Sequence, residues 1–209
     1  MTSNVRAAYA IDETNVASGN VRTIVLELCY FCLIRLGDLS RWRETLLVTK
    51  HRNWGPALGY YDLARTVFPE DGTCWHQRAV IAQLNEDYLE AAYGLYRSLT
   101  TVRPHPCSRD NLEIQLQAIV SQPMSSRDLL KANTEQQGTA YSLSDSFLQL
   151  HAFNLVPQGS RTENDLEDSC IRQLQLSLYE RSSTSAFSKT ITCSLATEYV
   201  AEKALEGEL

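Results

Sequence analysis

The sequence lacks the short motifs that mark common catalytic and nucleotide-binding sites. It has no glycine-rich phosphate loop, no Gly-x-Ser-x-Gly and no His-Glu-x-x-His. No cluster of carboxylates suggests a nuclease, and the histidines lack the spacing of metal ligands: His51, His76, His105 and His151. We therefore predict a binding protein that is not an enzyme and that uses no metal or cofactor.

Basic residues are also scarce. The 19 Lys and Arg are outnumbered by 25 Asp and Glu, which gives a net charge of −6. Proteins that wrap nucleic acid usually carry a basic excess, because Lys and Arg must replace the counterions of the phosphates. The composition therefore argues against avid nucleic-acid binding, although it is compatible with a local basic patch.

Signals for membranes and secretion are missing as well. The longest apolar run, around residues 24–34, contains Glu27 and is too short to span a bilayer. No signal peptide or N-x-S/T sequon is present, so we expect six reduced thiols in a nuclear or cytoplasmic protein. Cys29-x-x-Cys32 resembles half of a redox or zinc motif, but no second pair follows, and we interpret both residues as buried core thiols.

Helical periodicity dominates the patterned stretches, and none shows sustained period-two alternation. We predict an all-α protein without a sheet. Residues 21–36 have broad apolar coverage and should form a mostly buried helix, with a turn or weak break at Gly37-Asp38 before it resumes at 39–47. The other predicted helices span residues 54–68, 73–84, 88–102, 108–120, 143–153, 165–180 and 189–205.

This pattern divides the chain into four parts. Residues 1–20 are predicted to be a flexible lead-in and 21–120 a helical region. Residues 121–142 are rich in Ser, Gln, Asn and Gly and predict a linker or long loop, and 143–209 form a C-terminal region of helical hairpins.

A repeat of 34 residues runs through the centre. Its first unit places small, aromatic and proline residues at the spacing of the second helix of a tetratricopeptide repeat (TPR): Ala57, Tyr61, Ala64 and Pro69. The next unit supplies the expected large and small residues, and its closing proline comes one position late: Trp75, Ala79, Ala91 and Pro104. We predict TPR-like antiparallel hairpins, an α-solenoid, followed by further α-hairpins; the alternative is a generic helical bundle.

Several longer motifs occur in order. Residues 36–43 read Leu-Gly-Asp-Leu-Ser-Arg-Trp-Arg; Asn53-Trp54, Phe68-Pro69 and residues 96–99, Tyr-Arg-Ser-Leu, follow, and then residues 147–152, Phe-Leu-Gln-Leu-His-Ala. Over about residues 36–153 the chain resembles the telomerase-recruitment (ever shorter telomeres) proteins of yeast and the SMG proteins of nonsense-mediated mRNA decay. Arg78 and His105 depart from that family, where Leu and Phe are usual.

The resemblance implies a 14-3-3-like part that binds phosphopeptides. Arg41 and Trp42 match the Arg-Tyr pair that holds phosphate in the family, and Arg43 follows them. A guanidinium suits this role because its fork meets two phosphate oxygens. Only 35 residues precede the Leu-Gly-Asp motif, which implies a fragment or an N-terminally truncated, fungal-type member. A wider basic patch would add Arg35, Lys50 and Arg52; the alternative is a solvated helix face.

Two functions stay open. The first is an adaptor that binds a phosphorylated partner of the decay-helicase type in nonsense-mediated mRNA decay. The second is a telomerase accessory subunit that binds telomerase RNA or telomeric DNA. Aromatic side chains recur at helical intervals and would serve either as stacking platforms for single strands or, as we favour, as repeat core: Trp54, Tyr60, Tyr61, Trp75, Tyr93 and Tyr96.

Overall fold

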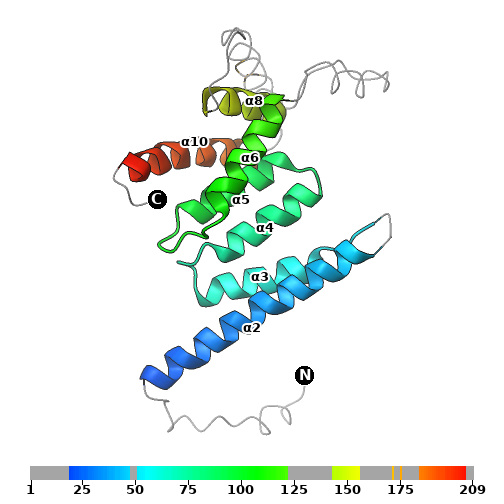
Figure 1. Ribbon diagram of the computed structural model, residues 1–209, viewed down its shortest axis with the longest axis vertical. Helices are drawn as coiled ribbons and strands as arrows, with labels where there is room; N and C mark the ends of the chain where they lie inside the picture. The colour runs from blue at the N-terminus through cyan, green and yellow to red at the C-terminus, as the bar shows by residue number, and fades with distance from the viewer. Residues whose placement is uncertain are drawn as a thin grey trace.

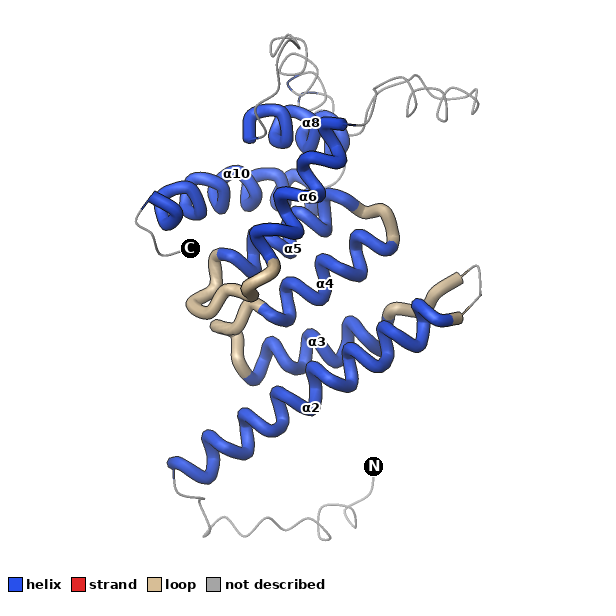
Figure 2. Tube along the Cα trace, in the orientation of Figure 1, coloured by secondary structure: helices blue, strands red, loops and turns tan. Residues whose placement is uncertain are grey.

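The computed structural model describes residues 19–47, 51–121, 143–155, 171, 175 and 184–205. Within these ranges the chain forms seven α-helices that pack as neighbours (Figure 1), and no strand is formed (Figure 2). The only extended pairing in the described ranges is an isolated parallel bridge between Asp71 and Arg103. The all-α prediction is therefore confirmed. Lys50, nearly all of the predicted linker at 121–142 and most of the predicted helix at 165–180 lie outside the described residues.

The helix boundaries follow the sequence pattern closely in the centre of the chain. Helix α4 has the predicted bounds, and the others begin or end within a few residues of prediction. The helices are α2 (Gly19–Leu46), α3 (Gly55–Val67), α4 (Thr73–Leu84), α5 (Tyr88–Leu99), α6 (Ser108–Ser121), α8 (Leu143–Leu155) and α10 (Thr184–Leu205).

Helix α2 is continuous, so the predicted break at Gly37-Asp38 is wrong. Gly37 is buried against the ring of Tyr61 on α3, and a Cβ atom at this position would lie 2.7 Å from Cδ1 of that ring. The glycine therefore permits a close helix–helix approach instead of ending the helix, although glycine inside a helix costs roughly 0.5–1 kcal/mol relative to alanine. Asp38 joins the same contact, because it accepts a hydrogen bond from the Tyr61 hydroxyl at 2.9 Å.

The prediction that the first helix is mostly buried is also wrong. Ile24, Leu28 and Phe31 are 55–58% exposed, and Cys29 and Cys32, expected in the core, are exposed too. Helix α2 lies at one end of the stack and packs chiefly against α3 (Figure 1). One neighbour can cover only one side of a helix that is apolar on several sides.

The α4–α5 hairpin confirms the repeat register. Ala79 on α4 and Ala91 on α5 are fully buried. Ala57 and Ala64 on α3 are at most 1% exposed. At the helix crossing a Cβ atom on Gly94 would lie 3.0 Å from the Cβ of Ala79. Such close approach explains why small residues occupy these positions. Trp54, Tyr61, Trp75 and Tyr96 are buried, as the core interpretation of the aromatic residues expects, whereas Tyr60 and Tyr93 are only partly buried.

Helix α5 lies at the centre of the main core. It packs against α4, α6 and α10, and its fully buried Leu95 shares one hydrophobic cluster with Leu148 on α8 and with Cys193 and Ala196 on α10. The Tyr96 hydroxyl is hydrogen-bonded to Nε2 of His151 on α8 at 2.7 Å. The two helices of the predicted C-terminal region that the structure describes therefore complete the core begun by the repeat.

A buried chain of polar groups fixes the loops at one end of the hairpin. Ser108 donates to Ser98 at 2.8 Å, Ser98 donates to the carbonyl of Gly72 at 2.8 Å, and Nδ1 of His76 lies 2.9 Å from the Ser108 hydroxyl. His105 stacks on His76 with ring centroids 3.8 Å apart. Burial lowers the pKa of His76 to about 4, so this imidazole is neutral at pH 7.

Candidate functional site

The residues predicted to hold phosphate lie on the C-terminal half of α2. Arg35 and Arg41 stand three residues on either side of Asp38 and both form ion pairs with its carboxylate, at 3.4 and 3.8 Å. Helical spacing of three residues brings such side chains to one face. Two guanidinium groups thus share one carboxylate, which leaves this face with an excess positive charge.

Arg41 is the more enclosed of the two arginines. Its side chain is 17% exposed, whereas that of Arg35 is 61% exposed and lies over the ring of Phe31. The Nε atom of Arg41 is buried and has no hydrogen-bond acceptor. Tyr61 contacts the same group, and burial raises the pKa of its hydroxyl, which therefore stays protonated and donates to Asp38.

Arg43 has a different partner. Its guanidinium donates to Glu44 Oε1 from two nitrogens, at 2.9 and 3.1 Å. The other carboxylate oxygen of Glu44 accepts the backbone N–H of Asn53 at 3.0 Å, and this bond together with Arg43 lowers the pKa of Glu44. The Arg43–Glu44 pair therefore ties the end of α2 to the start of α3.

The remaining predicted residues are dispersed. Trp42 is 60% exposed, and the Arg52 guanidinium lies 5.8 Å from the centre of the Trp54 ring. Lys50 lies outside the described residues. The structure thus brings together Arg35 and Arg41, with Asp38 and Tyr61 between them, and does not gather Arg43 and Arg52 into the same group.

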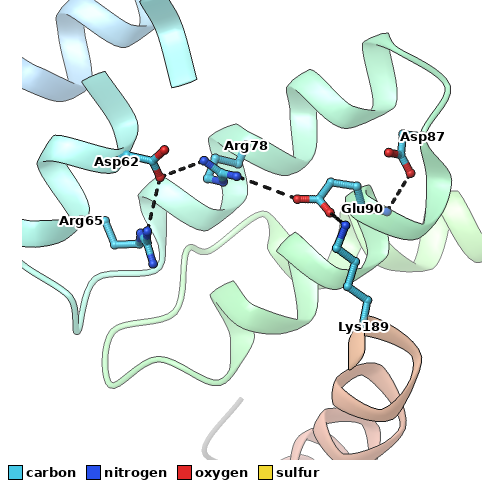
Figure 3. Close-up of polar contacts among 6 residues, drawn as sticks. All are labelled: Asp62, Arg65, Arg78, Asp87, Glu90 and Lys189. Atoms are coloured by element: carbon cyan, nitrogen blue, oxygen red, sulfur yellow. Dashed lines mark hydrogen bonds and ion pairs between the residues drawn. The ribbon is translucent and has the colours of Figure 1, made fainter. Parts of the chain in front are cut away.

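Sequence reasoning missed a second arginine-rich region. Arg65, Arg78 and Arg97 come from α3, α4 and α5, and all three guanidinium groups lie within 6.0 Å of the centre of the Trp75 ring. Figure 3 shows two of these arginines among the carboxylates that link α3, α4, α5 and α10. One signal was present in the sequence, because Arg78 stands where the resembling family usually has Leu.

Two further findings concern metal binding and membrane spanning. Among the described residues, no group of three or more His, Cys, Asp and Glu side chains is placed to hold a metal ion. In the same part of the chain, no helix has both the length and the apolar character needed to cross a membrane.

The sequence of most of the helical stack matches a known domain family. Residues 57–208 match the family described as Est1 DNA/RNA binding domain. The chain belongs to this family. The matched residues run from α3 through α10 and so contain both the α4–α5 hairpin and the C-terminal helices that complete its core. Members of the Est1/SMG7 family are generally non-catalytic adaptors.

The curated relatives include nonsense-mediated mRNA decay factors and a telomere elongation protein. The chain is 36% identical to the nonsense-mediated mRNA decay factor SMG7 of Arabidopsis thaliana over 89 residues, which is 42% of this chain and 8% of that protein. It is 37% identical to the telomere elongation protein est1 of Schizosaccharomyces pombe over 91 residues, 44% of this chain and 18% of that protein. With SMG7 of Danio rerio it shares 26% identity over 161 residues, 76% of this chain and 12% of that protein. The alignments thus cover less than a fifth of these relatives.

Proposed function

We propose that this chain is a non-catalytic adaptor that binds a phosphorylated protein partner in nonsense-mediated mRNA decay, acting in the nucleus, the cytoplasm or both. Its similarity to decay factors named SMG7 in a plant and a fish supports the choice of pathway. The partner class is a phosphoprotein of the decay-helicase type, which the 14-3-3-like motif at residues 36–43 implies.

The observation that carries the proposal is the pair of arginines around Asp38. A phosphoserine has about two negative charges at pH 7 and three acceptor oxygens, so it can satisfy more guanidinium donors than one carboxylate can. Arg41 already holds one buried N–H without an acceptor. A phosphate at this face would bind Arg41. It would also bind Arg35, whose exposed side chain can reorient toward it.

The test is a calorimetric titration of the full chain with a phosphoserine peptide and, separately, with the same peptide unphosphorylated. Wild type should prefer the phosphopeptide. Charge-assisted hydrogen bonds contribute roughly 1.5–3 kcal/mol each, so Arg41→Glu should weaken binding at least about tenfold. Arg22→Glu is the matched control, because Arg22 is an exposed residue on the same helix, and it should leave the affinity unchanged.

Arg41→Glu places a second carboxylate beside Asp38, so thermal unfolding of each variant must accompany the titration. Arg41→Gln, which removes the charge without adding repulsion, serves as the companion variant. If wild type binds both peptides equally, the phosphate proposal is wrong. If Arg41→Gln is folded and still prefers the phosphopeptide as wild type does, the phosphate binds elsewhere.

A telomerase accessory role is the second candidate. The matched family is described as a DNA/RNA binding domain, and the fission yeast relative is named for telomere elongation. In this role the chain would bind telomerase RNA or telomeric DNA. The dependence on salt separates the two functions, since log affinity for a nucleic acid falls linearly with log salt, with a slope set by the number of phosphates contacted.

A further inference from the structure

The indole of Trp75 is surrounded by arginine. The guanidinium carbons of Arg97 and Arg65 lie 4.6 and 4.8 Å from the ring centre, and that of Arg78 lies at 6.0 Å. Tyr93 packs edge-on against the same ring at 5.8 Å. Cation–π attraction favours each arginine singly, but three like charges around one ring repel one another. We call these three arginines and Trp75 the arginine cage.

Two carboxylates offset only part of this charge. Asp62 pairs with Arg65 at 3.4 Å and with Arg78 at 2.8 Å, and Glu90 pairs with Arg78 at 3.9 Å and with Lys189 at 2.5 Å (Figure 3). Arg97 forms no ion pair among the described residues. Four cations therefore face two carboxylates, and two positive charges stay uncompensated in a chain whose net charge is −6.

The cage also holds hydrogen-bond donors without acceptors. The Nε atoms of Arg65 and Arg78 are buried and have no partner. The contacts of the Arg97 guanidinium within the described part of the chain are ring contacts with Trp75 and Tyr93. Buried donors without a partner destabilise the folded state, so they are uncommon in folded proteins. An arriving anion with several oxygens would supply acceptors to the exposed N–H groups of the same arginines, whose side chains are partly exposed.

We propose that the arginine cage is an anion site for a phosphorylated side chain of a protein partner. The charge of a phosphomonoester, about −1.5 to −2, matches the two uncompensated positive charges. The site is reachable, because the Arg65 and Arg78 side chains are 40% and 24% exposed. It shares no residue with the Arg41 site, and it exists whether or not Arg41 binds phosphate.

A phosphoprotein fits the cage better than a nucleic acid does. Single-stranded nucleic acids bind by stacking bases on exposed aromatic faces. Trp75 is only 8% exposed and its ring is occupied by arginine, so no base can stack there. A long polyanion would also meet the overall negative charge of the chain, whereas a single phosphate responds mainly to its immediate neighbours.

The test uses the full chain and inorganic phosphate, at constant ionic strength maintained with sodium chloride. Proton–nitrogen correlation spectra report on the Trp75 indole N–H and on the Nε–H groups of the cage. Both sets of signals should shift saturably with phosphate and should not shift with acetate at the same ionic strength. Arg97→Gln should weaken binding at least about tenfold, equivalent to about 1.4 kcal/mol.

Controls distinguish this site from the one on α2. Arg41→Gln should leave the phosphate-induced shift of Trp75 unchanged, and Arg22→Gln should do the same. Should Arg97→Gln unfold the chain, Arg65→Gln replaces it with the same expected loss. If phosphate gives no saturable shift, or acetate gives an equal one, the arginines merely pack on Trp75 and the proposal is wrong. A response to oligothymidylate but not to phosphate also overturns it, in favour of nucleic acid.

Discussion

Helices α2 and α5 are both rich in apolar residues, yet they lie in opposite environments in the structure. Helix α5 is covered by α4, α6 and α10, and Leu95 at its centre is fully buried. Helix α2 is more than twice as long, yet Leu28 and Phe31 in its middle are more than half exposed. Periodicity thus predicts that both are helices, but burial is decided by how many neighbours the fold supplies.

The largest expected effect comes from removing the same side chain in the two helices. Leu95→Ala should destabilise the protein by about 2–5 kcal/mol, because it leaves a cavity at the centre of the main core. Leu28→Ala on α2 should change the free energy of unfolding by less than about 0.5 kcal/mol. Chemical denaturation of both variants makes the measurement, and equal losses would mean that α2 is covered in solution.

Acid should weaken the region around α4 and α5. Burial lowers the pKa of both His76 and His151 to about 4, whereas an unfolded histidine has a pKa of about 6.5. The unfolded chain therefore binds more protons between pH 6.5 and 4, and stability falls as the pH falls through that window. We expect a loss of about 4 kcal/mol between pH 7 and 5 from the two residues together.

Denaturation curves at several pH values measure this loss, and hydrogen exchange locates it. Protection should fall first around α4, α5 and α8, which carry or contact the two imidazoles. His76→Gln should remove about half of the dependence on pH. A dependence that is unchanged in this variant would show that His76 titrates normally in the folded protein. The carboxylates with lowered pKa values, Glu44 and Asp71, act only at more acidic pH.

Overpacking should be tolerated at the end of the stack and not at its centre. Ala79→Leu forces a larger side chain between α4 and Gly94 of α5 and should cost about 1–3 kcal/mol. Val25→Leu adds a methylene group to the half-exposed face of α2 and should be neutral within about 0.5 kcal/mol. Thermal unfolding separates the two outcomes. Unchanged stability in Ala79→Leu would contradict the repeat register.

The smallest expected effect lies in the turn between α4 and α5. Glu86 has a φ angle of +59°, a left-handed conformation that Asn adopts more readily than Glu. Glu86→Asn should stabilise the hairpin by about 0.5 kcal/mol, because it relieves part of the 1–2 kcal/mol that this conformation costs. Leu84→Asn, just before the turn, is a control without this benefit. A loss of stability in Glu86→Asn would show that the Glu86 side chain makes a needed contact.

The central helices were predictable because their signals are local. Small residues at Ala57, Ala64, Ala79 and Ala91 reflect close helix approach, and the proline and glycine at 69 and 72 mark the end of α3. The role of Gly37 could not be read in this way. Glycine breaks helices in isolation, and only the ring of Tyr61 on the next helix explains its place inside α2.

The two candidate sites differ in the same way, because one depends on residues close in sequence and the other on the packing of separate helices. Arg35, Asp38 and Arg41 lie one helical turn apart, so their meeting follows from the sequence. The arginine cage could not be foreseen, since Arg65, Arg78 and Arg97 come from three helices and meet only when α3, α4 and α5 pack. The exposure of Cys29 and Cys32 was missed for a related reason, because apolar neighbours in sequence do not guarantee neighbours in space.

The shared core of α5 and α10 has a consequence for synthesis of the chain on the ribosome. Leu95 packs in one cluster with Cys193 and Ala196 on α10. One side of α5 therefore stays uncovered until roughly a hundred further residues have been synthesised. At 5–20 residues per second that interval is about 5–20 s. Throughout it the nascent hairpin displays an apolar side, which is a binding surface for chaperones. Mutations in α10 should therefore lower the yield of folded protein in cells more than their effect on equilibrium stability suggests.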